Sequence, residues 1–193
     1  NFDIAAATAR ALGRRGEKTA EVALLPLLSH SQAHVRLAAA EALAHCGSSN
    51  ALPVLAAAMA MDNEPLLEHA LIFALYQLAD KPTLFGLLEN PNPRVQKAAL
   101  ALLVSHRALD ANTVVRRVAA DDEPLRRAAL AILKEHTEWG AFAEPLIREM
   151  LNKPLGSENT PLRDLIIAFQ TEPGVQALVA RSIINTNLAS KQR

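Results

Sequence analysis

The sequence predicts an all-α protein, a right-handed α-solenoid of about six short helical hairpins that spans residues 1–193 as a single array. Three observations support this fold class: an apolar stripe that returns at a nearly constant interval, a turn signal ahead of each stripe, and a composition rich in helix formers. Half of the residues are hydrophobic but only 4% are aromatic. Alanine and leucine, both strong helix formers, make up most of the apolar content.

Each apolar stripe has the spacing of one helix face. The stripe that starts at Val35 continues through Ala38, Ala39, Ala42 and Leu43, which are the i, i+3, i+4, i+7 and i+8 positions of a helix. Similar stripes begin 28 to 37 residues apart. Their first residues, the anchors, are Ile4, Val35, Leu67, Val95, Leu125 and Leu162. One hairpin cannot bury its own apolar faces, so the hairpins are expected to stack.

Turn signals divide each unit into a shorter helix A and a longer helix B that carries the anchor. Asn-Pro-Asn-Pro at 90–93 and Asp-Asp-Glu-Pro at 121–124 offer capping side chains and a proline for the first helical turn. Pro26 should kink or end the first A helix, and residues 152–158 are expected to form the longest loop. The A helices are expected at 18–29, 51–61, 82–88, 111–119 and 140–152.

The two ends of the sequence resemble the interior of a longer repeat array. The chain opens on Asn-Phe-Asp-Ile, and a last A helix at 173–184 is followed by the polar segment Asn185-Thr186-Asn187. We therefore expect the chain to be a fragment of a longer protein. Gly13 and Gly16 are isolated glycines, expected in a turn after the first helix and not in a phosphate-binding loop.

Charge and cysteine content narrow the function classes. Lysine plus arginine number 20, and so do aspartate plus glutamate, so no overall field attracts nucleic acid or an anionic membrane. No apolar run approaches the roughly 18 residues that a membrane span requires. Cys46, the only cysteine, has no partner for a disulfide or zinc site and is expected to be a small buried hydrophobe.

The anchor motifs resemble a known repeat family. Val35-Arg36-Leu37-Ala38-Ala39, Val95-Gln96-Lys97-Ala98-Ala99 and Leu125-Arg126-Arg127-Ala128-Ala129 are similar to short HEAT repeats, including those named for phycobilisome lyases. The resemblance covers nearly the whole chain. It implies the HEAT-type solenoid fold, which hosts many unrelated functions.

Four strings, at 67–75, 94–100, 135–140 and 169–178, resemble the HEAT section of large membrane-bound dehydrogenase-like proteins of planctomycete bacteria. In that family the section lies between a sugar-dehydrogenase-like β-propeller and a c-type cytochrome domain. The resemblance implies a spacer or docking role in a redox protein, with a periplasmic or exported location. It transfers no catalytic residue and no cofactor, because Gly47, Ser48 and Ser49 follow Cys46 and leave no haem-attachment motif.

Two enzyme-like alternatives rest on few residues. Glu68-His69 and Glu135-His136 invite comparison with the iron-binding His-Glu pairs of HEAT-type deoxyhypusine hydroxylases, but their order is reversed and their repeat positions differ, so no metal site is predicted. Trp139, together with the doublets Arg14-Arg15, Arg116-Arg117 and Arg126-Arg127, invites comparison with HEAT-like alkylpurine DNA glycosylases. The balanced charge disfavours nucleic acid, and Trp139 is interpreted as a packing plug between repeats.

Two surfaces remain as functional candidates on the B helices, which in HEAT solenoids line the concave side. Arg36, Arg126 and Arg163 follow their anchors directly and are expected to bind carboxylates or carbonyls in a ladder that links adjacent turns, where Asp62, Asp121, Asp122 and Glu158 lie. The alternative is that these arginines form a docking strip for an acidic partner. The aromatic patch is the second surface: His69, Phe73 and Tyr76 share one face at i, i+4 and i+7, bordered by Leu37, Lys97 and Arg127. Phe73 and Tyr76 either anchor a partner there or pack against the next repeat. We therefore predict a non-enzymatic scaffold or spacer without metal or cofactor, which binds a protein partner or neighbouring domains rather than nucleic acid, a membrane or a small molecule.

Overall fold

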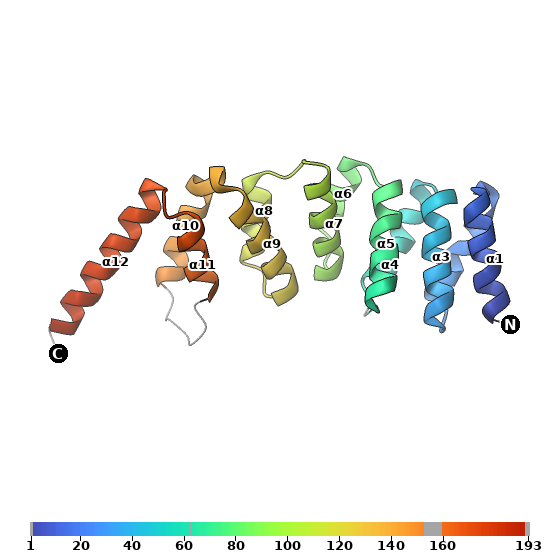
Figure 1. Cartoon of the computed structure of the whole chain (residues 1–193), viewed down its shortest axis with the longest axis horizontal. Helices are drawn as coiled ribbons and strands as arrows, with labels where there is room; N and C mark the ends of the chain where they lie inside the picture. Colours follow the sequence, from blue (N-terminus) through green and yellow to red (C-terminus); the bar gives the residue numbers. More distant parts are fainter. Residues whose placement is uncertain (1, 62, 153–159, 192–193) are drawn as a thin grey trace. The chain divides into compact units, whose positions relative to one another are not determined.

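The computed structural model describes residues 2–61, 63–152 and 160–191, and within them every regular element is a helix (Figure 1). The predicted all-α solenoid class is confirmed. The backbone divides into two compact units, Asn1–Ala108 and Leu109–Arg193, and each is described by itself. Most of the loop expected at 152–158 lies outside the described residues.

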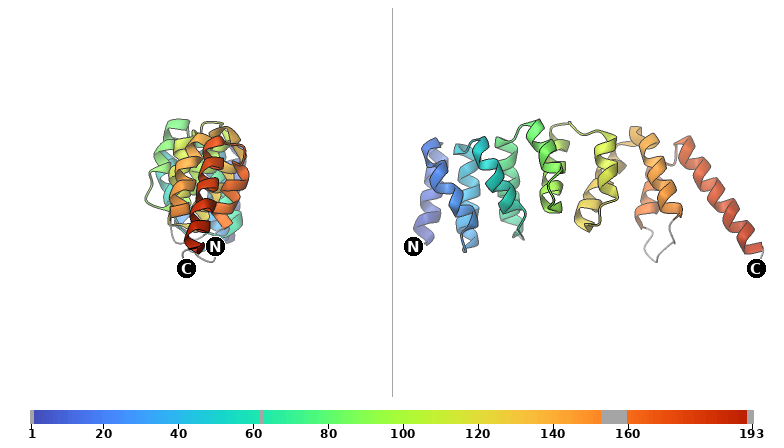
Figure 2. Two further views of the ribbon diagram at one scale, coloured as in Figure 1. Left: turned by 90° about the vertical axis from the view of Figure 1, so that its left-hand side faces the viewer. Right: turned by 180° about the vertical axis from the view of Figure 1, so that it is seen from behind.

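The first unit consists of helical hairpins that stand side by side (Figures 1 and 2). Neighbouring B helices pack against each other, α1 on α3 and α3 on α5. The B helices are α1 (Phe2–Arg15), α3 (Ala33–Cys46), α5 (Pro65–Leu78) and α7 (Pro93–Ser105). The A segments are η1 (Lys18–Ala20) with α2 (Glu21–Leu24) and η2 (Leu25–Ser29), η3 (Ser49–Ala51) with α4 (Leu52–Met59), and α6 (Lys81–Leu88).

The second unit repeats this arrangement. Helix α8 packs on α9, α11 contacts both α9 and α10, and α12 packs on α10. Its elements are α8 (Ala111–Val118), α9 (Glu123–Glu135), η4 (Thr137–Trp139), α10 (Gly140–Asn152), α11 (Thr160–Ala168) and α12 (Pro173–Lys191). The prediction that the last helix stops before Asn185 is wrong: α12 continues to Lys191, because asparagine and threonine lower helix propensity only slightly.

Proline and capping residues set the helix limits as expected. The first A segment changes from α-helix to 3₁₀-helix at Leu25, directly before Pro26, which confirms the predicted break. The Asn92 side chain caps α7 by accepting from the Arg94 backbone N–H at 2.9 Å. Asp122 caps α9 through the backbone N–H of Leu125, also at 2.9 Å.

The predicted stripes form most of the core, although Ala128, Ile132 and Ile166 are only half-buried and the stripe of α1 differs from the prediction. The five residues from Val35 to Leu43 and the five from Leu67 to Leu75 are all buried. In α1, however, Ile4 is 64% exposed, and Ala6, Ala9 and Gly13 are buried instead. The anchor expected at Ile4 is therefore wrong. Helix α1 presents its smallest residues to α3, and their small side chains allow the two helices to approach closely.

Gly13 makes that contact possible. It lies within α1, not in the turn predicted from the sequence; the turn glycine is Gly16, whose φ is +63°. A Cβ atom added to Gly13 would lie 2.6 Å from the Cα atom of Ala42 and 2.9 Å from its Cβ atom. The backbones of α1 and α3 therefore meet at a point that excludes any side chain.

The side chain directly after the anchor donates a hydrogen bond to the preceding turn in three repeats. Arg36 Nη1 donates to the carbonyl of His30 at 2.8 Å, and Arg126 Nη1 donates to that of Ala120 at 2.9 Å. Gln96 makes the same bond to Asn90 at 2.8 Å. The carbonyls bound by Arg36 and Arg126 lie six residues earlier in the same repeat. These bonds satisfy the open C-terminal end of the A helix and do not link adjacent turns as predicted.

The remaining members of that predicted ladder behave differently. Arg163 Nη2 lies 3.7 Å from the carboxylate of Asp164. Asp62 and Glu158 lie outside the described residues. A bond between neighbouring turns does exist in the first unit, where Asn92 Nδ2 donates to the Ala60 carbonyl at 3.0 Å.

Candidate functional site

Helix α5 presents aromatic side chains beside its buried stripe. Phe73 and Tyr76 are 38% and 45% exposed, and His69 is also exposed. Leu67, Ala70, Leu71, Ala74 and Leu75 are buried in the same helix. The i, i+4, i+7 spacing places the three exposed side chains on one face, because these positions follow each other along a helix surface.

Both α5 rings are held by histidines of neighbouring repeats. The Phe73 ring meets that of His45, at the end of α3, edge to face with centroids 6.1 Å apart. The Tyr76 ring stacks on His106, after α7, with centroids 5.3 Å apart and planes 19° apart. We call His45, Phe73, Tyr76 and His106 the aromatic row. It extends the predicted patch from one helix to three repeats of the first unit.

His106 contributes a buried polar atom to this row. Its Nε2 is buried and makes no hydrogen bond within the part of the chain that the structure describes. A buried nitrogen without a partner costs free energy. The contact between the His106 and Tyr76 rings offsets part of this cost but gives Nε2 no hydrogen bond.

The predicted border of the patch is partly occupied by an ion pair. Lys97 Nζ lies 2.9 Å from the Glu68 carboxylate and links α7 to α5. Leu37 on α3 is half-buried. Arg127 belongs to the second unit, where its guanidinium binds Glu123 at 2.6 Å, so its place at the patch remains a prediction.

A hollow of about 330 Å³ opens between α1 and α3. We call it the α1–α3 hollow; it is lined by Arg10, Gly13, Arg14, Glu41, Ala42 and His45. Arg10 Nε lies 3.3 Å from Glu41 Oε2. His45 lines the hollow and also contacts Phe73, so the hollow and the aromatic row share this residue.

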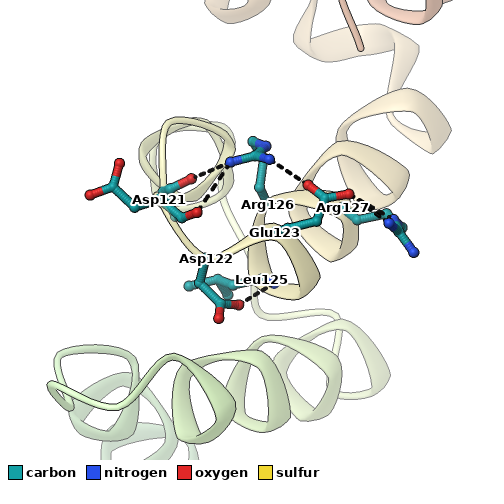
Figure 3. A network of polar contacts seen from close by, with 7 residues as sticks. Asp121, Asp122, Glu123, Leu125, Arg126 and Arg127 are labelled. Atoms are coloured by element: carbon teal, nitrogen blue, oxygen red, sulfur yellow. Dashed lines mark hydrogen bonds and ion pairs between the residues drawn. The ribbon is translucent and has the colours of Figure 1, made fainter. Parts of the chain in front are cut away.

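The second unit has its own charged hollow, of about 740 Å³. It is lined by Glu123, Arg126, Arg127, Leu130, Ala131, Lys134, Pro161 and Asp164. Figure 3 shows Glu123 between Arg126 and Arg127, with Asp122 turned to the Leu125 backbone. The two arginines hold the pKa of the Glu123 carboxyl below its usual value, mainly through the hydrogen bond from Arg127. Lys134 pairs with Asp164 at 3.0 Å, so the cations of this hollow already have carboxylate partners.

The residues behind the enzyme-like alternatives have other contacts. Glu68 binds Lys97, and the His136 ring stacks on Trp139 with centroids 4.0 Å apart. Trp139 is only half-buried, and this stack lies within one turn. Among the described residues, no three His, Cys, Asp or Glu side chains are grouped closely enough to hold a metal ion.

The arginine doublets and the cysteine also have local roles. Arg117 is buried and donates to the Thr113 carbonyl at 2.9 Å. Cys46 is buried, as predicted, with its Sγ 3.2 Å from the Ala42 carbonyl. Burial raises the pKa of the Cys46 thiol. These groups face the protein rather than a ligand.

Comparison with known proteins identifies the repeat class. Residues 1–76 match the family model described as HEAT repeats, the repeat type that the anchor motifs predicted. No curated protein matches the sequence. No helix in the described residues is both long and apolar enough to cross a bilayer.

Three solved structures resemble the chain. YibA from Escherichia coli has 19% identity and a TM-score of 0.44 over 90% of this chain and 73% of that one. The CpcE–CpcF complex of phycocyanin lyase from Nostoc sp. PCC7120 has 24% identity and a TM-score of 0.38, covering 84% and 71%. An engineered protein has 17% identity and a TM-score of 0.39, covering 92% of each chain.

Sequence reasoning missed His45, His106, Arg10 and Arg14 as parts of this surface. His45 comes ten residues after the anchor Val35, and His106 comes eleven after Val95. A repeated histidine near the end of a B helix was therefore the available signal. The arginines gave none, because the incorrect anchor in α1 obscured which of its faces meets α3.

Proposed function

We propose that the chain is a non-enzymatic interaction scaffold that binds a protein partner through the aromatic row and its border. The observation that carries the proposal is the pair of exposed α5 rings, Phe73 and Tyr76, each fixed by a histidine of a neighbouring repeat. Rings that are already ordered lose little side-chain entropy on binding. Exposed aromatic anchors of this kind commonly dominate the binding energy of protein interfaces.

The charge around the row also suits a protein partner. The Lys97–Glu68 pair neutralises one side of it, and a polar rim around an apolar centre is the usual composition of an interface. The arginines at the second unit's hollow are held by Glu123, whereas nucleic acid requires cations that can reach phosphates. These contacts argue against nucleic-acid binding at the hollow of the second unit.

Selection of peptides tests the proposal without a known partner. An extended peptide of about 12 residues reaches across four helices, at ~3.3 Å per residue and ~8–10 Å between neighbouring helix axes. We would select such peptides from a displayed random library on the whole chain. Binders are expected to be lost on Phe73→Ala and Tyr76→Ala.

Phe85→Ala is the matched control. Phe85 is 37% exposed, close to the value for Phe73, but lies on the A helix α6. Peptides that bind Phe85→Ala but not Phe73→Ala support the proposal. Peptides that bind all three variants equally well refute it.

A more specific proposal follows from the resemblance to planctomycete dehydrogenase-like proteins. In it, the partner is a redox domain of the same polypeptide, and the HEAT section acts as a spacer in a periplasmic or exported protein. The selected peptides supply the test, because their sequences should match surface segments of such a domain. Selected sequences unrelated to any flanking domain argue against it.

A further inference from the structure

We infer that the α1–α3 hollow binds a carboxylate of the same partner segment that contacts the aromatic row. The inference rests on the proposed function and adds the chemistry of the partner: an acidic residue followed or preceded, a few residues away, by an aromatic or large apolar one. Four observations support it: the donors that remain available in the hollow, their charge, the shared wall at His45, and the distance to Phe73.

Arg10 offers the hollow unused donors. Its contact with Glu41 uses Nε alone, at 3.3 Å, and neither Nη nitrogen has a partner within the described residues. A guanidinium presents its N–H groups in a planar fork that fits a carboxylate. Glu41 therefore orients Arg10 and leaves the outer end of the fork available to a ligand.

Arg14 adds a second guanidinium one helical turn later. It is exposed, lines the hollow, and makes no ion pair or hydrogen bond in the part of the chain that the structure describes. With Glu41 as the only acid among the lining residues, the two arginines leave a net positive charge. An anionic group is thus favoured over a neutral or cationic one.

His45 joins the hollow to the aromatic row. His45 is one of the residues that line the hollow, and its ring meets that of Phe73. A chain that places a carboxylate in the hollow therefore passes directly over His45 toward α5. The surface therefore has a polar end at α1 and an apolar end at α5.

The geometry also sets the spacing of the recognised motif. The hollow lies between α1 and α3, and Phe73 lies on α5, the next B helix. With neighbouring helix axes ~8–10 Å apart, the path measures about 12–15 Å, or roughly four residues of an extended chain. The acidic and the apolar residue of the partner should therefore be separated by about three to five positions.

The selected peptides test this inference through a charge exchange. We would synthesise the tightest binder and its acid-to-amide version (Glu→Gln or Asp→Asn), then titrate both against the wild-type chain, Arg10→Gln, Arg14→Gln and Arg15→Gln. Arg15 is the matched control, because it is exposed at the same end of α1 but does not line the hollow. We expect roughly 10-fold weaker binding for Arg10→Gln or Arg14→Gln and less than about 2-fold for Arg15→Gln.

The amide peptide separates direct recognition from general attraction. It should bind the wild-type chain roughly 10-fold more weakly, but should lose little further affinity on Arg14→Gln, because the two groups act as one pair. Equal losses for Arg14→Gln and Arg15→Gln would overturn the inference, since they indicate nonspecific attraction. Binders that depend on Phe73 but lack an acidic residue overturn it while leaving the proposed function intact. Acidic binders that need Arg14 but not Phe73 overturn the proposed function and the combined motif with it.

Discussion

The contact between α1 and α3 leads to the most quantitative prediction. It concerns two Gly→Ala substitutions, of which one should lower the melting temperature and the other should raise it. In Gly13→Ala, the new Cβ would lie 2.6 Å from the Cα of Ala42, on the backbone of α3. Overpacking of this kind costs about 1–3 kcal/mol. The higher helix propensity of alanine offsets about 0.5–1 kcal/mol of that cost.

From the middle of these two ranges we therefore expect a net loss of about 1–1.5 kcal/mol for Gly13→Ala, which lowers Tm by about 2–6 °C in a chain of this size. Gly86→Ala is the control, because no atom lies within 4 Å of the Cβ that it would add on α6. There only the propensity term acts, and Tm should rise by about 1–4 °C.

Thermal unfolding followed by circular dichroism measures both variants under the same conditions. The same chemical change, Gly→Ala, is expected to shift Tm in opposite directions at the two positions. A Gly13→Ala protein that melts at or above the wild-type temperature would refute the close approach of α1 and α3. A Gly86→Ala protein destabilised as much as Gly13→Ala would show that the shift does not report this contact.

Three further predictions concern single residues. Arg107 has a φ of +47°, a conformation that costs a non-glycine residue about 1 kcal/mol, so Arg107→Gly should raise Tm; a lower Tm contradicts this. Buried Cys46 should react with a thiol reagent far more slowly in native than in denatured protein, and equal rates would contradict its burial. Asp110 caps α8 by accepting a hydrogen bond from the backbone N–H of Thr113. This bond holds the pKa of the Asp110 carboxyl below its usual value. The ionised Asp110 carboxyl therefore stabilises the fold above its unfolded-state pKa, ~3.9, and this stabilisation is lost as pH falls through the lower folded-state pKa. Asp110→Ala should cost about 1 kcal/mol of unfolding free energy at neutral pH and less below pH ~4. A pH-independent difference in the free energy of unfolding, measured with urea, contradicts the last prediction.

Repeat periodicity made most of the fold predictable. The stripes from Val35 and Leu67 identified the buried face of α3 and α5, because their large and small apolar residues recur at helical spacing. The A helix at 140–152 was predicted to the residue. Helix α1 was misread because alanine fills several of its faces, and the pattern alone does not distinguish Ile4 from Ala6 as the residue that meets α3.

The candidate surface was predictable only within one helix. Spacing alone placed His69, Phe73 and Tyr76 on a common face of α5. Their neighbours come from other repeats, and the rings of His45 and His106 meet them only after the hairpins stack. The α1–α3 hollow was not predictable either. It is lined by Gly13, and the sequence alone does not show that another helix packs against this glycine.

The most direct test of the account is the affinity of one selected peptide for Phe73→Ala compared with Phe85→Ala, measured by titration calorimetry. The two side chains have nearly equal exposure, 38% and 37%, and lie on a B helix and an A helix. We predict at least about 30-fold weaker binding for Phe73→Ala, the loss typical of an interface hot spot, and less than about 2-fold for Phe85→Ala. Equal affinities, or a larger loss for Phe85→Ala, would contradict the assignment of the binding surface to the B helices of the first unit.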